Sequence, residues 1–179
     1  MKAQSPHWIF ATGYINDLVL IKKQMGDQKM EAPVVTMIAG PAYQEFITAT
    51  GKSSENISSA SWWHTAARYK GQDIFGSTEN YTKLFREKYK GDPDYAQASA
   101  SVSGALFQMA IEKAGSIDRN KVRDELARMN VQTFWGPVKF GPNGQITSLE
   151  PPVFQIQNGK TVVVYPAAIK QGEFKLGVN

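Results

Sequence analysis

Three short apolar runs near the start of the chain each end in polar and aromatic residues, and they predict three buried strands. The runs cover residues 8–13, 33–38 and 57–61, and apolar residues recur at helical spacing between them. Asn16 or Asp17 is the expected N-cap of the first of these helices. This strand–helix alternation predicts a parallel sheet with right-handed crossovers. The nearly continuous apolar run at 8–13 predicts a strand buried on both faces.

The rest of the chain predicts three more helices and then a β-hairpin. One helix begins at Ser77 or Thr78, the longest covers residues 95–114, and Asp118 caps a shorter one. Residues 153–157 and 160–165 alternate as strands around Asn158-Gly159, a pair that favours the two positive φ angles of a type I′ turn. The pattern therefore predicts an α/β fold with a C-terminal β-hairpin.

Aromatic residues gather where the three predicted strands end. Ligands of parallel sheets bind beyond the carboxyl ends of the strands, so these residues are candidates for a binding wall. They are Tyr14 after the first strand, Pro41, Ala42 and Tyr43 after the second, and Trp62, Trp63 and His64 after the third. A single aromatic residue at such a place usually belongs to the core, whereas three clusters at consecutive strand ends are equally compatible with a binding cleft.

Composition excludes several classes of protein. Hydrophobic content of 42% and charged content of 20% are those of a globular domain, and no apolar run reaches the ~18–20 residues of a transmembrane helix. The net charge of +4 is scattered among acids, which argues against nucleic-acid binding. With no cysteine and two histidines, disulfides, zinc–thiolate sites and multi-histidine metal sites are excluded, and we expect no cofactor.

Catalytic motifs are not found in the sequence. It contains no nucleophile elbow, zinc-binding His-Glu-x-x-His or phosphate-binding glycine loop. His64 stands beside two tryptophans, but no nucleophile or acid is tied to it by a known spacing, so a polar ligand contact or a surface position is favoured over a general base. Asp92 and Asp94 flank a proline and indicate turn chemistry.

The order of several short motifs resembles one family. Gly13-Tyr14 and Gly40-Pro41 end two strands, a break precedes Tyr95 and its alanine-rich helix, and Gly136-Pro137-Val138-Lys139-Phe140 lies near the end. Together these are similar to the C-terminal half of type I periplasmic binding proteins, in the branched-chain amino acid (leucine/isoleucine/valine) group of ABC-transporter receptors.

The resemblance implies two α/β lobes that close over a ligand, each a parallel sheet with helices on both faces. It places residues 1–94 and 150–179 in the second lobe and 95–149 in the first, so that this chain is a fragment of a two-lobe protein. Helices 95–129 would then expose apolar surface unless they repack or the fragment dimerises.

The resemblance also bears on the ligand. Amino-acid-binding members resemble one another in carrying a glutamate shortly after the Gly-Pro, where it pairs with the ligand's ammonium, whereas this chain has Ala42 and Tyr43. A buried ammonium without its partner costs several kcal/mol, so we expect an aromatic or other non-amino-acid carboxylate. Tyr95 and Gln97 would lie near the hinge between the lobes.

The favoured interpretation is a non-enzymatic, periplasmic solute receptor with two partners, a small-molecule ligand and the membrane permease of an ABC importer. Three alternatives stay open at this point: a ligand-sensing regulatory domain of the same fold, a receptor for branched-chain amino acids, and an α/β enzyme. A fused output domain would favour the sensor, and turnover that depends on His64 would favour the enzyme.

Overall fold

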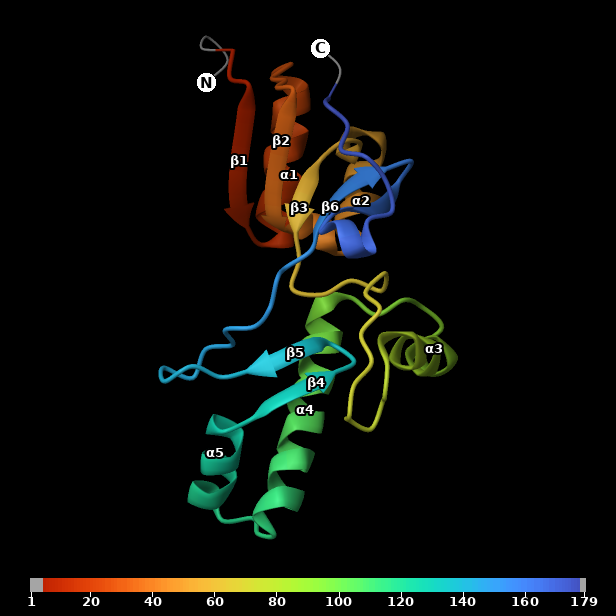
Figure 1. The fold of residues 1–179 in the computed structure, drawn as a ribbon. Helices are drawn as coiled ribbons and strands as arrows, with labels where there is room; N and C mark the ends of the chain where they lie inside the picture. Colours follow the sequence, from red (N-terminus) through yellow and green to blue (C-terminus); the bar gives the residue numbers. More distant parts are fainter. Residues whose placement is uncertain (1–4, 178–179) are drawn as a thin grey trace. The chain divides into compact units, whose positions relative to one another are not determined.

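The computed structural model describes residues 5–177, which form two compact units (Figure 1). Unit 1 combines residues up to 61 with those from 151 onward, and unit 2 comprises residues 62–150. These units divide the chain after residue 61 and after residue 150, whereas the lobe boundaries implied by the resemblance lie after residues 94 and 149. Whether the units correspond to lobes of a longer protein stays a prediction.

Unit 1 is built on a five-stranded sheet in the order β1-β2-β3-β6-β7. The strands β1 (Trp8–Gly13), β2 (Val34–Ala39) and β3 (Ser58–Ala60) are parallel, as predicted. The strands β6 (Val153–Gln157) and β7 (Lys160–Tyr165) form the predicted hairpin and join β3 in antiparallel fashion. Asn158 and Gly159 have φ angles of 54° and 71°, so the turn has the expected positive-φ pair.

The helices α1 (Ile15–Asp27) and α2 (Gln44–Thr50) pack on one face of this sheet. Their buried residues share one core with apolar residues of the strands and with Ile57, which precedes β3. This core includes Ile9, Leu18, Met25, Met37, Phe46, Ile47, Ile57 and Ile156. Strand side chains point alternately to the two faces, and Trp8 and Phe10 on the other face are 60% and 56% exposed. The prediction that the first strand is buried on both faces is therefore wrong.

The entry to α1 also differs from the sequence prediction. The helix begins at Ile15, and its N-cap is Tyr14, which makes no side-chain capping bond. Its first turn is closed by the Leu18 N–H, which donates to the Tyr14 carbonyl at 3.0 Å. Asn16 and Asp17 therefore lie inside the first turn, where the negative carboxylate of Asp17 interacts favourably with the positive end of the helix dipole.

Two buried glutamines fasten the C-terminal segment to the hairpin. Gln155 Nε2 donates to the carbonyls of Asn56 and Lys175 at 2.9 and 2.7 Å, and Gln157 Nε2 donates to the carbonyl of Glu173 at 2.7 Å. A buried amide without such partners would destabilise the fold, so these contacts explain why two polar residues occupy a buried strand.

Unit 2 contains three helices and a two-stranded sheet: α3 (Thr78–Tyr89), α4 (Tyr95–Ala114), α5 (Arg119–Ala127), β4 (Asn130–Thr133) and β5 (Gly136–Lys139). Capping residues set the helix ends, and those at Ser77 and Asp118 agree with the sequence prediction. The side chains of Ser77, Asp94 and Asp118 accept backbone N–H groups at three N-termini, and Gly115 ends α4 in the left-handed conformation.

Aromatic side chains from distant parts of the chain fill the core of unit 2. The Tyr81 ring stacks on Phe134 at 4.1 Å between centroids, and Trp63 meets Tyr81 edge-on at 5.7 Å. Two polar contacts fix this core, since Thr78 Oγ1 donates to the Phe134 carbonyl at 2.6 Å and Asp73 accepts the Phe134 N–H at 2.7 Å. The segment from Trp63 to Tyr81 is thereby part of unit 2.

The long helix α4 leaves part of its surface exposed. Phe107 is 54% exposed, and Ile111 and the following Ile117 are also exposed. This agrees with the expectation of exposed apolar surface on helices 95–129, while dimerisation of the chain stays a prediction. No helix among residues 5–177 is both long and apolar enough to cross a membrane.

Candidate ligand-binding site

The carboxyl ends of β1 and β2 bring four of the predicted site residues to one edge of the sheet in unit 1. Gly13 pairs in register with Ala39, so the residues that follow these two strands are neighbours. Tyr14 is 85% exposed there, and the 3₁₀ turn Gly40–Ala42 leads into half-buried Tyr43 and then α2. Pro41 is buried within this turn. Two tyrosines therefore flank a small, uncharged turn.

Close packing fixes the backbone of this turn. A side-chain carbon on Gly40 would lie 2.8 Å from Leu18 Cδ1 and 3.1 Å from Phe46, so the backbone sits directly on the helices of unit 1. The preceding Ala39 has a φ of 82° and a ψ of −60°. That conformation strains a residue with a side chain by about 1–3 kcal/mol. Strained backbone of this kind is concentrated at ligand sites and turns, so it supports the assignment of this edge as functional.

The third predicted cluster belongs to unit 2 and has three different environments. Trp62 is 57% exposed, whereas Trp63 is 2% exposed and is a core residue, in edge contact with Tyr81 and Phe134. The expectation that Trp63 belongs to a binding wall therefore disagrees with its position, because a ring that is 2% exposed has almost no surface to offer a ligand. A role for Trp62 stays a prediction.

His64 is half-buried and electrically neutral at physiological pH. Burial lowers the pKa of its imidazole from 6.5 to about 4, and the negative charge of Asp92 opposes this effect only in part. Its Nδ1 accepts the Ala66 N–H at 3.0 Å, so the neutral ring carries its proton on Nε2. A ring in this state donates a hydrogen bond but is a poor base, which is consistent with binding.

Tyr95 and Gln97 lie in the first turn of α4. Gln97 Oε1 accepts the Asp94 N–H at 2.8 Å, while Asp94 accepts the N–H groups of Ala96 and Gln97. This reciprocal capping box accounts for the glutamine without a ligand. Half-buried Tyr95 packs against the core of unit 2. Ligand contacts of both residues stay predictions.

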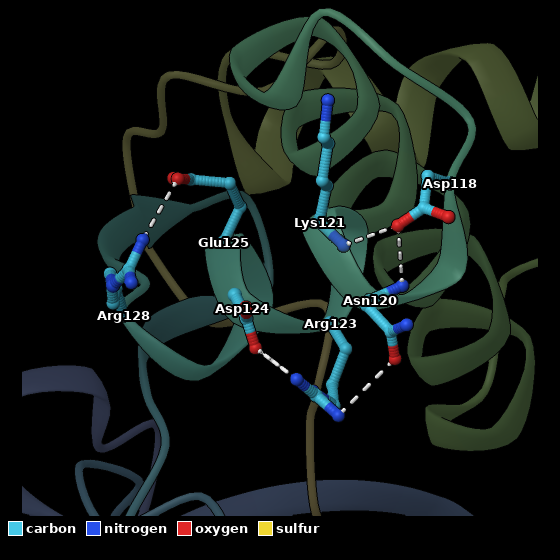
Figure 2. A network of polar contacts seen from close by, with 7 residues as sticks. All are labelled: Asp118, Asn120, Lys121, Arg123, Asp124, Glu125 and Arg128. Carbon is cyan, nitrogen blue, oxygen red and sulfur yellow. Dashed lines mark hydrogen bonds and ion pairs between the residues drawn. The ribbon is translucent and has the colours of Figure 1, made fainter.

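Residues 5–177 contain no group of three or more His, Asp or Glu side chains placed to hold a metal ion. Figure 2 shows a network of polar contacts on and beside α5, where Arg123 contacts Asp124 and Asn120, and Arg128 at the end of the helix pairs with Glu125 at 3.3 Å. Its arginines are mostly exposed, so each pair contributes roughly 0–1 kcal/mol of stability.

Sequence reasoning missed the residues that organise unit 2. Asp73, Thr78 and Thr133 are buried polar side chains that bind backbone groups of the aromatic core. No periodic pattern marks residues 62–77, because hydrogen bonds from isolated polar side chains hold this segment. Asp73 and Thr78 also bind Phe134, which lies 61 and 56 residues away in sequence, and local spacing cannot show such a pairing.

Comparison with solved structures finds the same fold. The leucine binding protein LivK from Thermotoga maritima matches with a TM-score of 0.77 and 22% identity over 90% of this chain and 44% of its own. LivJ from Streptococcus pneumoniae, solved with isoleucine, gives 0.75 and 21% over 89% and 45%. A solute binding protein from R. palustris, solved with benzoate, gives 0.72 and 14% over 96% and 46%.

The chain thus spans less than half the length of each of these structures. The family model described as "Periplasmic binding protein" matches residues 1–161, which is most of the sequence. This extent agrees with the α/β fold and with the order of motifs noted above. The chain belongs to the periplasmic binding protein family.

Proposed function

We propose that this chain is part of an extracytoplasmic solute receptor that delivers a small molecule to the membrane permease of an ABC importer. The observation that carries the proposal is the edge of the sheet in unit 1, where exposed Tyr14 and half-buried Tyr43 flank the Gly40–Ala42 turn in a member of this family. Tyrosines offer a ligand a large contact area and a hydroxyl that fixes its orientation, at low entropic cost. The site acts by binding, with the ligand held between closing lobes of the longer protein.

The ligand that this edge favours is an aromatic or other non-amino-acid carboxylate. Ala42 presents no carboxylate to an ammonium group. The acids that follow Tyr14 and Tyr43 in the chain, Asp17 and Glu45, are exposed in the first turns of α1 and α2. The solved relative that holds benzoate is compatible with this choice. The relatives named for leucine and isoleucine favour a branched-chain amino acid as the second candidate.

Thermal unfolding of the 179-residue chain with benzoate, leucine and isoleucine tests the proposal. A ligand at ~100 times its dissociation constant stabilises the folded state by about 2.7 kcal/mol, which raises the melting temperature measurably. We expect a shift with benzoate that Tyr14→Ala and Tyr43→Ala abolish. The matched control Leu20→Ala, an exposed residue of α1, leaves the shift intact.

The other outcomes separate the candidate ligands. If leucine raises the melting temperature and Glu45→Gln abolishes this shift, the receptor function is supported and its ligand is an amino acid rather than an aromatic acid. If none of the three compounds shifts the melting temperature, the result contradicts ligand binding at this edge.

A further inference from the structure

A hollow lies within unit 2, lined mainly by residues of α3 and α4. Its volume is about 630 Å³, which is within the range of roughly 300–1,000 Å³ that small-molecule pockets occupy. The wall on α3 carries Tyr81, Phe85 and Lys88, and the wall on α4 carries Ala100 and Ser101. This hollow is separate from the edge of the sheet in unit 1 on which the proposed function rests.

The inner wall of this pocket is a continuous aromatic surface. The Tyr81 ring lies 5.0 Å from Phe75 and 6.1 Å from Phe85, and Phe85 lies 4.5 Å from Tyr89. Tyr81 is itself held in place by stacking on Phe134 and by a 3.1 Å hydrogen bond between its hydroxyl and Ser101. A wall of fixed rings favours a flat aromatic guest, which gains contact area with little loss of side-chain freedom.

A cation stands at the mouth of the pocket. Lys88 Nζ lies 5.3 Å from the centre of the Tyr89 ring, and no carboxylate within residues 5–177 forms an ion pair with it. The neighbouring Asp92 is instead bound to Arg86. Asp92 itself lines the pocket, but Arg86 offsets its negative charge, so Lys88, Arg86 and Asp92 together leave a net positive charge that favours an anionic group on the guest.

We propose that the pocket between α3 and α4 binds a planar aromatic anion, with its ring against Phe85 and Tyr89 and its carboxylate at Lys88. Small Ala100 leaves the space for the ring on the opposite wall. The proposal goes beyond the receptor function, because it needs neither the Tyr14–Tyr43 edge nor the closure of two lobes.

Fluorescence titration of the 179-residue chain with 2-naphthoate tests this pocket, with neutral 2-naphthol as the matched uncharged probe. We expect saturable 1:1 binding, with naphthoate about 2–5 times tighter than naphthol because of the single ion pair at Lys88. Lys88→Gln removes this difference, whereas the control Lys83→Gln, an exposed lysine of the same helix, preserves it. Added salt at about 0.5 M reduces the difference in the wild-type chain.

A variant that fills the pocket tests whether the probes bind here or elsewhere on the chain. Ala100→Leu weakens both probes at least about tenfold by occupying the space of the ring, while Ala96→Leu, an exposed alanine one turn earlier on α4, leaves binding unchanged. Circular dichroism checks that each variant is folded. If Ala100→Leu loses structure, Phe85→Leu is the second variant and weakens both probes by removing the ring surface.

Two results overturn the proposal. The first is a lack of saturable naphthoate binding up to about 1 mM, an affinity of roughly −4 kcal/mol. The second is binding that survives Ala100→Leu and is lost in Tyr14→Ala or Tyr43→Ala, which would assign the probe to the edge of unit 1.

Discussion

Substitution of His64 by glutamine should change how strongly the stability of unit 2 depends on pH. The folded state holds this imidazole neutral, because burial lowers its pKa from 6.5 to about 4 against the smaller opposing effect of Asp92. In the unfolded chain the ring regains its ordinary pKa and binds a proton more readily. Glutamine cannot bind a proton, and its carboxamide oxygen can still accept the Ala66 N–H that His64 Nδ1 accepts.

The direction follows from proton linkage. Between the two pKa values the unfolded state binds more protons than the folded state, so stability rises with pH and is lost as pH falls. With pKa values of 6.5 and about 4, the loss is about 2 kcal/mol between pH 7 and pH 5 and about 3 kcal/mol by pH 4. His64→Gln should lose less stability than the wild type by these amounts.

Urea unfolding followed by tryptophan fluorescence measures this difference in unit 2 alone if Trp8 is first changed to phenylalanine. The other three tryptophans, Trp62, Trp63 and Trp135, all lie in unit 2. Titration of the carboxylates affects both proteins alike, so it cancels in the difference between them.

Parallel stability curves for His64→Gln and its parent between pH 7 and pH 5 would refute the reasoning. Such a result would mean that the imidazole titrates with nearly its ordinary pKa and is solvated in the folded state. A steeper fall for the variant than for its parent would refute the sign of the effect as well.

Two further substitutions test the packing. In Gly71→Ala the new side-chain carbon would lie 2.5 Å from the Thr133 backbone and clash with the Asp73 carboxylate. Chemical denaturation should therefore show that the free energy of unfolding falls by about 2–3 kcal/mol. Gly26→Ala, with open space around it, is the control, and an equal fall there would contradict this explanation. Ala39→Gly should raise stability by about 1 kcal/mol, since glycine adopts a φ of 82° without strain; a fall in the unfolding midpoint would show that the turn is unstrained.

Local chemistry explains which parts of the fold were predictable. The Asn158-Gly159 turn, the three parallel strands and the caps at Ser77 and Asp118 all depend on residues a few positions apart, and each was confirmed. The start of α1 was misplaced because two good capping residues, Asn16 and Asp17, follow an extended Tyr14 that already ends the strand. Which residue becomes the N-cap depends on where the preceding strand ends as well as on the side chain of that residue.

Long-range contacts explain what could not be predicted. An apolar run such as Trp8–Gly13 does not reveal whether one face or two will be covered, and here Trp8 turns its indole to Thr36 Oγ1 at 2.9 Å on the uncovered face. The division of the chain after residue 61 depends on contacts such as those of Trp63 with Tyr81 and Phe134. Neither pairing has a signature in local periodicity.

The same physics separates the aromatic residues that build the fold from those available to a ligand. Unit 2 has only a two-stranded sheet among its described elements, so large rings such as Trp63 and Phe134 fill its interior. Unit 1 has a five-stranded sheet whose interior is filled largely by aliphatic side chains and methionines, and it has no need of Tyr14 for its core. Removal of the Tyr14 ring, 85% exposed, should therefore leave stability within about 0.5 kcal/mol, so any loss of ligand binding in Tyr14→Ala reports on recognition.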